Sequence, residues 1–353
     1  MIEAIRARRR AAAAPALTIP WAVVALVVLL GSALLALAVG PVELGITRIA
    51  RELVSHVPFA GIHSPFSPTE NAIFWELRAP RVALGLLVGA MLASAGAAYQ
   101  GVFRNPLADP YLLGAAAGAG LGATLVIAYA HAASSRELRP VAAFAGATIG
   151  VAAAYVLGRS VGGRTTATLI LAGVTVASFL TALQTFVQQQ NTDTVQEVYA
   201  WLLGQLETSG WRDVGVVLPY VTVSWVVLLV HRRLLDVLAV GDEEAASLGV
   251  SVTRVRLIVL AAATLGTAAA VALSGLIAFV GIIVPHAIRL LAGTSYRVVL
   301  PLSLAFGAAF LVLADLLART IMAPAELPIG VVTAFFGAPF FAVLLRTTRT
   351  VGP

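Results

Sequence analysis

The sequence predicts an all-α, polytopic membrane protein with about ten transmembrane helices. Of its 353 residues, 59% are hydrophobic and only 11% are charged, whereas soluble domains average about 25% charged residues. The mean hydropathy is +0.94, and apolar runs of about 20 residues, long enough to span a bilayer, recur along the chain. The net charge of +6 comes from scattered arginines, so the composition argues against a nucleic-acid-binding protein.

Ten segments qualify as spans. With the N-terminus inside, 15 of the 23 arginines fall in inner segments and 8 in outer ones, and because cytoplasmic loops carry the basic excess, we expect both termini in the cytoplasm. A single transmembrane domain then covers 19–346, between cytoplasmic tails at 1–18 and 347–353. The expected spans are 19–40, 80–100, 111–131, 140–158, 167–189, 212–231, 254–274, 276–293, 299–319 and 327–346.

Two external segments do not qualify as spans. Residues 41–77 are expected to be mostly coil, because proline, serine and small residues dominate 58–71, with a short turn at Glu70–Leu77 before the second span. The segment 190–211 is polar and short, so it predicts an external amphipathic helix followed by a turn, with aromatic side chains at the interface.

Small residues at four-residue spacing flank the first inner connection, between the second and third spans. Gly85, Gly89 and Ala93 precede it, and Gly114 and Gly118 follow it. Such spacing lets helix backbones approach each other closely inside a membrane. We therefore expect both flanking helices to pack tightly against neighbours.

The connection itself is a polar elbow at Arg104–Pro110. Pro106 disfavours helical geometry at Asn105 and ends the preceding helix. Asp109 is expected to cap the next helix, with Pro110 in its first position. Non-helical backbone near a bilayer is tolerated where protein buries it or where it lines a watery cavity. The residues alone are compatible with an ordinary tight turn or with a functional elbow.

The longest inside loop, 231–256, predicts a short surface helix at about Glu243–Leu248. Asp242 is a good N-cap, and the two glutamates that follow suit the positive end of a helix. Gly249 is a natural C-terminal stop. From charge alone, a solvated loop would explain the same residues.

No catalytic or nucleotide-binding motif is present. All 23 basic residues are arginines, so a phosphate-binding loop with its lysine is impossible and energy must arrive through a partner. Cysteine is absent, and His286 beside Arg289 is expected to be structural rather than a metal or haem ligand. The lack of nucleophile and metal constellations argues against an intramembrane enzyme.

An ion-gradient-driven secondary transporter is the alternative function. Such a carrier needs carboxylates inside its spans, and only Asp315 qualifies. Arg319 lies four residues further on and so shares its helix face, where it can pair with that carboxylate.

Several motifs occur in one fixed order. They are R-x-P-R at Arg78–Arg81, G-x-x-L-A-x-x-G-x-x-x-Q ending at Gln100, R-N-P-L-A-D-P at the elbow, L-G-x-x-x-G-A after it, and E-L-P-I-G at Glu326–Gly330. With them the chain resembles, from about Val23 to Arg346, the FecCD-family permease subunits of ATP-driven ABC importers for ferric siderophores, cobalamin and haem. The resemblance implies a multi-pass protein of the bacterial plasma (inner) membrane that is a transport subunit and not an enzyme.

The resemblance also implies the partners. Two permease chains, a second copy or a paralogue, would pair around a central pathway. Two ABC ATPase subunits, which use ATP and Mg, would sit below, and an extracytoplasmic substrate-binding protein would deliver the cargo from above. No cofactor or metal is expected on this chain. Ferric siderophore is placed first among the cargoes, then cobalamin, then haem.

Three groups of residues match the family's functional positions. Salt bridges to glutamates of the binding protein are expected from Arg78, Arg81 and Arg319. The cytoplasmic gate is expected at Asn105, Leu107, Thr165 and Thr166, although helix capping explains the two threonines equally well. A coupling helix at about 241–250 would contact the ATPase through Asp242, Glu243, Glu244, Ala245, Leu248 and Gly249.

Overall fold

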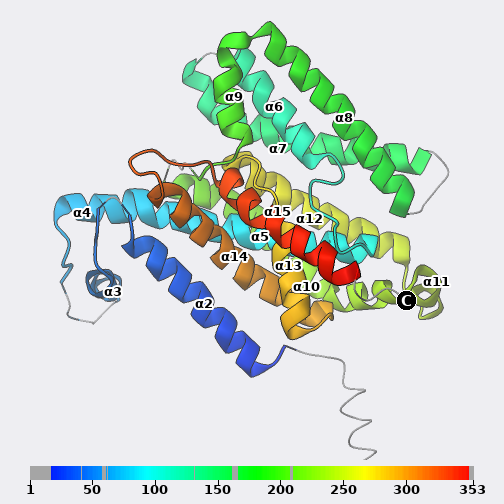
Figure 1. Ribbon diagram of the computed structural model, residues 1–353, viewed down its shortest axis with the longest axis horizontal. Coiled ribbons are helices and arrows are strands. Elements are labelled where there is room, and N and C mark those ends of the chain that lie inside the picture. Colours follow the sequence, from blue (N-terminus) through cyan, green and yellow to red (C-terminus); the bar gives the residue numbers. More distant parts are fainter. Residues whose placement is uncertain are drawn as a thin grey trace, which may run out of the picture.

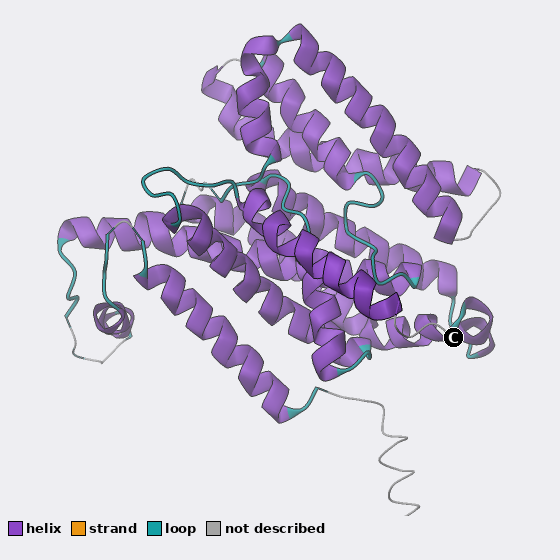
Figure 2. Ribbon diagram, in the orientation of Figure 1, coloured by secondary structure: helices purple, strands orange, loops and turns teal. Residues whose placement is uncertain are grey.

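The computed structural model describes residues 17–40, 42–57, 61, 63–130, 132–160, 166–206 and 210–349. Figure 2 shows helices joined by loops, with no strand in these ranges. Among the described residues, seven helices are long and apolar enough to cross a membrane, and three shorter apolar helices accompany them. The all-helical, polytopic prediction is confirmed. Most of the two predicted tails, 1–16 and 350–353, lies outside the described residues.

Each expected span corresponds to one helix. In chain order these are α2 (Ile19–Ala38), α5 (Ala79–Phe103), α6 (Ala115–Tyr129), α7 (Ala132–Ser160), α8 (Thr166–Gln190), α10 (Trp211–Val240), α12 (Val252–Ser274), α13 (Val280–Ala292), α14 (Tyr296–Thr320) and α15 (Ile329–Arg349). The connecting elements are α3 (Ile46–Ser55), α4 (Pro68–Ala72), a π-helical turn (Ile73–Arg78), a 3-10 turn (Thr192–Thr194), α9 (Val195–Leu202) and α11 (Asp242–Ser247).

Helix α5 is the central element of the bundle. It packs against α2, α10, α12, α13 and α14, and most of its residues are buried. Helices α6 to α9 form a group beside this bundle, at the top of Figure 1. Helices α3 and α4 lie at one end of the molecule and α11 lies at the other. These two ends are referred to below as the α3 end and the α11 end.

The small residues predicted to permit close helix contacts do so. Gly89 of α5 faces the backbone carbonyl of Gly307 in α14, and Gly118 of α6 faces that of Gly146 in α7. A Cβ atom at Gly89 or Gly118 would overlap the facing backbone. The absence of side chains therefore sets the distance between these helices, as in other membrane bundles.

The segment expected to be external coil contains helix at Pro68–Ala72, which corrects the prediction. Ser67 Oγ accepts from the Glu70 N–H at 3.3 Å, and the Ser67 N–H donates to Glu70 Oε2 at 2.8 Å. This reciprocal capping box, with proline in the first helical position, starts a helix even in a proline- and serine-rich stretch. The helix then continues through the expected turn into α5.

Helix α3 was also not predicted. Its Glu52 is fully buried and accepts from Trp75 Nε1 at 2.9 Å. Arg48 of the same helix donates to Glu70 at 2.6 Å, and this hydrogen bond raises the pKa of Arg48. The partners that hold α3 lie 22 and 23 residues further along the chain, beyond the reach of local sequence patterns. By contrast, the short helix expected within 190–211 is present as α9.

Candidate functional site

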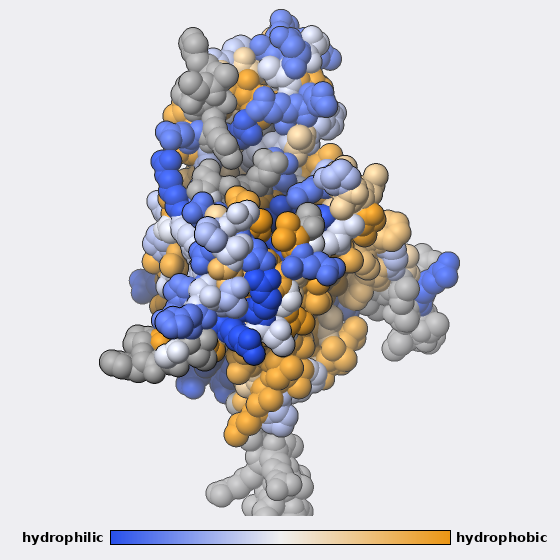
Figure 3. Space-filling model, turned by 90° about the vertical axis from the view of Figure 1, so that its left-hand side faces the viewer, coloured by the Kyte–Doolittle hydropathy of each residue, from blue (hydrophilic) through white to orange (hydrophobic). Residues whose placement is uncertain are grey.

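Five charged residues meet at the α3 end of the molecule and form what we term the arginine corner. They are Arg78, Arg81, Asp315, Arg319 and Glu326. Two of the three arginines expected to dock a partner are buried, since Arg78 is 6% exposed and Arg319 is 5% exposed. Figure 3 views this end face-on and shows hydrophilic side chains gathered over its middle and upper part, above a hydrophobic region.

The two buried arginines hold the C-terminal end of α2. Arg78 Nη1 donates to the carbonyl of Leu37 at 3.1 Å and Nη2 donates to that of Val42, while Arg319 Nη2 donates to that of Ala36. The last carbonyls of a helix lack partners within the helix and carry its negative dipole end. In this conformation both guanidinium groups therefore cap α2 and do not face solvent.

Arg81 is the most accessible arginine of the corner, with 19% of its side chain exposed. Its Nη2 lies 2.8 Å from Asp315 Oδ1 and 2.8 Å from Glu326 Oε2. Asp315 is buried at 2% exposure, whereas Glu326 is 48% exposed. The expected pairing of Asp315 with Arg319 is present at 3.7 Å, but the closer partner of Asp315 is Arg81, 234 residues away.

The E-L-P-I-G segment joins this corner to α9. The N–H of Ile329 donates to the carbonyl of Gly204 at 3.0 Å, and that of Gly330 donates to the carbonyl of Leu203 at 2.9 Å. Gly330 has no space for a Cβ atom beside the Leu203 carbonyl. The motif thus fixes Glu326 next to Arg81 and ties the start of α15 to the end of α9.

The elbow lies where α5 ends. Arg104, the residue after α5, has a left-handed φ of +51°. Asn105 Oδ1 accepts from the Leu107 N–H at 2.9 Å, so the asparagine side chain holds the turn. The Leu107 side chain is 47% exposed. Asn105 and Leu107, both expected gate residues, therefore lie in one tight turn that contains Pro106.

The expected cap of the next helix by Asp109 is wrong. Helix α6 begins at Ala115, after Gly114 with its φ of +85°. Asp109 Oδ1 instead accepts from the Tyr111 N–H at 2.8 Å, and the Tyr111 hydroxyl donates to the carbonyl of Ile277 at 3.1 Å. This tertiary anchor keeps the chain irregular up to Gly114. Burial raises the pKa of Asp109 to about 6.

The second pair of expected gate residues is described only in part. Thr165 lies outside the described residues. Thr166 is the first residue of α8 and is half-buried. The contribution of this pair to a gate therefore stays a prediction.

A buried glutamine holds the elbow against α13. Gln100 Nε2 donates to the carbonyls of Gly281 at 3.0 Å and Ala108 at 3.3 Å, and Gln100 Oε1 accepts from Arg289 Nη1 at 2.5 Å. The glutamine is 2% exposed. Sequence reasoning did not assign it a role, although a glutamine inside an apolar span is itself a signal of a buried polar contact.

The expected surface helix is α11, displaced by one residue from the prediction. Its N-cap is Gly241, with a φ of +152°, and Asp242 is the first helical residue. The N-cap assignment of Asp242 is therefore wrong, because its carboxylate contacts Arg256 Nη2 at 3.1 Å and Arg104 Nη2 at 3.1 Å instead. The guanidinium groups of Arg104 and Arg256 therefore bind this carboxylate in place of the backbone N–H groups of α11.

The C-terminal end of α11 matches the prediction. Gly249 has a φ of +78°. Its N–H donates to the carbonyl of Ala246 at 2.9 Å, and the Val250 N–H donates to that of Ala245 at 3.0 Å, which is a Schellman motif. Ala245 is fully buried, whereas Leu248 is 69% exposed. The remaining coupling candidates, Glu243 and Glu244, are exposed at the same end.

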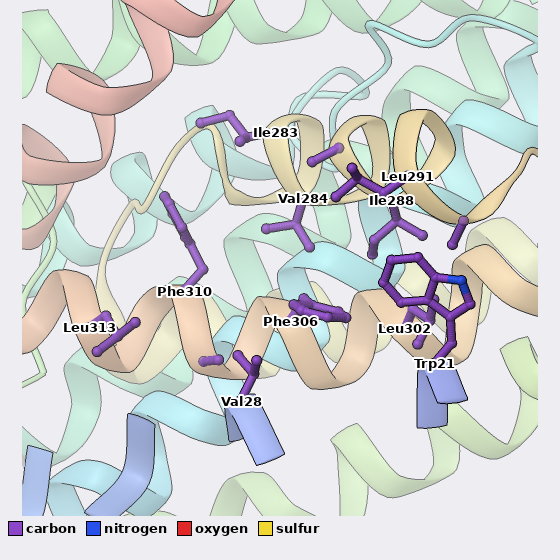
Figure 4. Close-up of a pocket in the computed structure, with 13 residues that line it drawn as sticks. Trp21, Val28, Ile283, Val284, Ile288, Leu291, Leu302, Phe306, Phe310 and Leu313 are labelled. Carbon is purple, nitrogen blue, oxygen red and sulfur yellow. The ribbon is translucent and has the colours of Figure 1, made fainter. Parts of the chain in front are cut away.

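Two apolar cavities lie between helices in the described part of the chain. One, of about 260 Å³, lies between α2, α13 and α14, where Trp21, Phe306 and Phe310 line it (Figure 4). The other, of about 420 Å³, lies mainly between α7 and α12. Neither is lined by a charged side chain. Both can accommodate hydrocarbon, but they offer no ionic ligand to a polar cargo.

No group of three His, Asp or Glu side chains that could hold a metal ion occurs among the described residues. The His286 ring meets Phe340 edge-on at 5.8 Å, and neither of its nitrogens has a hydrogen-bond partner in this part of the chain. Two features indicate the family better than any metal site does. The motifs follow one order along the chain, and the structure places the arginine corner at one end of the molecule and the elbow and α11 at the other.

The FecCD transport family matches residues 26–347. The chain belongs to this family. It is 45% identical over 278 residues to the cobalamin import system permease protein BtuC of Halobacterium salinarum, covering 79% of this chain and 74% of that protein. It is 41% identical over 284 residues to the Fe(3+)-citrate import system permease protein YfmD of Bacillus subtilis, covering 80% of this chain and 84% of that protein.

A solved structure supports the same assignment. An inward-facing ABC transporter, proposed to be of the metal-chelate type, superposes with a TM-score of 0.79 at 28% identity, covering 92% of this chain and 97% of that one. This FecCD protein is therefore a multi-pass permease subunit of an ABC importer in the plasma (inner) membrane. The ion-gradient alternative gains no support from these relatives, which are permeases of ABC systems.

Proposed function

We propose that this permease imports an iron chelate, with a ferric siderophore placed first, or a related metal tetrapyrrole such as cobalamin or haem. The observation that carries the proposal is the family match over 26–347, with relatives of 45% and 41% identity named for cobalamin and ferric citrate import.

The proposed assembly contains two permease chains, two ABC ATPase subunits and an extracytoplasmic binding protein. The excess of arginines in the inner segments supports a cytoplasmic α11 end and an external α3 end, with both termini in the cytoplasm. ATP binding would move α11 and shift the elbow between two discrete conformations.

Reconstituted transport tests this function. The chain is co-purified with an ABC ATPase and a binding protein from the same organism, and uptake of a ferric siderophore, cobalamin and haem is compared in proteoliposomes. We expect ATP-dependent uptake of one cargo, which is lost without the ATPase. Uptake driven by an ion gradient in the absence of the ATPase would overturn the proposal.

We propose that the arginine corner docks the binding protein. Arg81 would make the first contact, because its side chain is the most accessible of the three arginines. Arg78 and Arg319 would join when the carbonyls of α2 release them. Guanidinium groups suit this role because they bind carboxylates in a bidentate manner.

Glu326→Gln should tighten docking. Glu326 occupies both terminal nitrogens of Arg81, at 3.1 and 2.8 Å, and a carboxylate of the binding protein would have to displace it. Exposed ion pairs are worth up to about 1 kcal/mol, so we expect an affinity gain of up to about fivefold at low salt. Titration of the binding protein against the complex in nanodiscs measures it.

The matched control for docking is Glu137→Gln, which removes an exposed carboxylate paired with Arg212 at 3.1 Å outside the corner. It should leave the affinity unchanged. Equal or weaker binding by Glu326→Gln would contradict docking through Arg81.

Leu107→Ala should make the closed permease leak, if the elbow forms the cytoplasmic gate as we propose. The exposed leucine side chain would be the plug, and Asn105 would orient it through its 2.9 Å hydrogen bond to the Leu107 backbone. Efflux of preloaded cargo from sealed vesicles without ATP measures the leak, and we expect a several-fold faster rate. Leu290→Ala, equally conservative and 70% exposed on α13, is the control. Identical efflux from both variants would reject the gate.

A further inference from the structure

One carboxylate joins three separate elements at the α11 end. Asp242, the first residue of α11, lies 3.1 Å from Arg104 Nη2, at the end of α5. Its two oxygens also accept from Arg256 Nη2 of α12, at 3.1 and 3.3 Å. The residue that follows Arg104 is Asn105, whose side chain holds the elbow turn.

The two halves of this cluster differ in burial. The side chain of Arg256 is 9% exposed, whereas those of Arg104 and Asp242 are 39% and 42% exposed. A buried guanidinium keeps its partner because leaving it unpaired is costly. An exposed ion pair is weak and readily exchanged with water. Arg256 thus fixes the position of the carboxylate, while the Arg104 contact can form and break.

The body of α11 packs on α10 and α12, its neighbours in the chain, and it buries Ala245 there. Among the described residues, the pair of Arg104 and Asp242 is the ion pair between α11 and the end of α5. On its other side the elbow is held to α13 by Gln100.

We propose that Asp242 is a positioning residue through which a displacement of α11 reaches the elbow, with Arg104 as the contact that transmits it. This inference rests on the proposed function, in which the ATPase moves α11. The elbow would then be pulled from one side by a breakable ion pair while Gln100 anchors it to α13. Asp242 acts in this role on the backbone that precedes Asn105 and touches no cargo.

The test is a double-mutant cycle with Arg104→Gln, Asp242→Asn and the double variant in the reconstituted complex. Uptake and ATP hydrolysis are measured together. We expect each single variant to lower the uptake per ATP hydrolysed by at least about fivefold, the lower end of couplings between sites. The double variant should be no worse than the poorer of the two singles, because both remove the pair of Arg104 and Asp242. A merely structural defect would lower yield and ATPase assembly but not this ratio.

Arg254→Gln is the matched control for Arg104→Gln, since it removes an exposed arginine of α12, for which the described structure shows no ion pair. It should keep the wild-type ratio. Asp242→Asn leaves the buried Arg256 without its carboxylate partner and could therefore fail to fold. In that case Arg104→Gln, which keeps the pair of Asp242 and Arg256, carries the test by itself. If the wild-type complex transports normally and Arg104→Gln keeps the same uptake per ATP hydrolysed, this inference alone is overturned. Absence of ATP-dependent uptake by the wild-type complex would overturn the proposed function and this inference with it.

Discussion

Replacing Gly96 with alanine should strongly destabilise the native bundle. Gly96 lies on the central helix α5, and its Cα faces the backbone of Gly281 in α13 so closely that an added Cβ would overlap the Gly281 carbonyl. The obstacle is main chain, so no side-chain rotation relieves it. The two helices would have to separate where Gln100 donates to that same carbonyl at 3.0 Å.

Overpacking of this kind costs about 1–3 kcal/mol or more, and the lost hydrogen bond adds to it. Yield after size-exclusion chromatography and the thermal unfolding midpoint in detergent measure the effect. Gly31→Ala in α2 is the control, because no atom lies within 4 Å of the position that its Cβ would take. Alanine favours helix over glycine, so the control should match or slightly exceed wild type. A Gly96→Ala protein with an unchanged midpoint would show that α5 and α13 do not touch as described.

Asp315→Asn should be the most destabilising of the conservative changes at the arginine corner. Asp315 is 2% exposed and accepts from Arg81 at 2.8 Å, with Arg319 Nε at 3.7 Å. The substitution keeps the shape but leaves the buried Arg319 without a carboxylate. Breaking a buried pair from one side costs about 3–5 kcal/mol. The free energy of unfolding, measured by denaturant titration in mixed micelles, should fall by that amount.

Glu326→Gln gives the matched comparison, because it removes the other acid from the same Arg81. Glu326 is 48% exposed, and solvent replaces its charge, so the cost should stay within about 1 kcal/mol. Equal losses for the two variants would mean that Asp315 is not buried in the native state. The pairing with Arg81 also argues against Asp315 as an ion-binding site, because a transported ion would have to compete with Arg81 for the carboxylate oxygens.

The contacts of the arginine corner also hold α2 in place. This helix buries little of its own surface, and Arg78 and Arg319 hold its C-terminal carbonyls. Docking that recruits these two arginines would therefore loosen α2. Under our docking proposal, contact at the α3 end and the position of α2 are linked through the same guanidinium groups.

The sequence by itself determined which segments form the long apolar helices and some of the turns between them. The segment expected at 254–274 is α12, Val252–Ser274, and the stop expected at Gly249 is a Schellman motif. Such features depend on the length of apolar runs and on the φ that a glycine permits, both of which are local properties. The family motifs likewise placed the chain in the FecCD family before any contact was known.

Only the tertiary structure decided which partner each charged side chain has. Arg81 pairs with Asp315 from 234 residues away, and Arg78 faces carbonyls of α2. The Asp242 carboxylate joins arginines of α5's end and α12 instead of capping its own helix. The start of α6 was misplaced for a similar reason, since Tyr111 is held by Ile277. A buried charge takes the nearest group that can satisfy it, and which group is nearest depends on how distant helices pack.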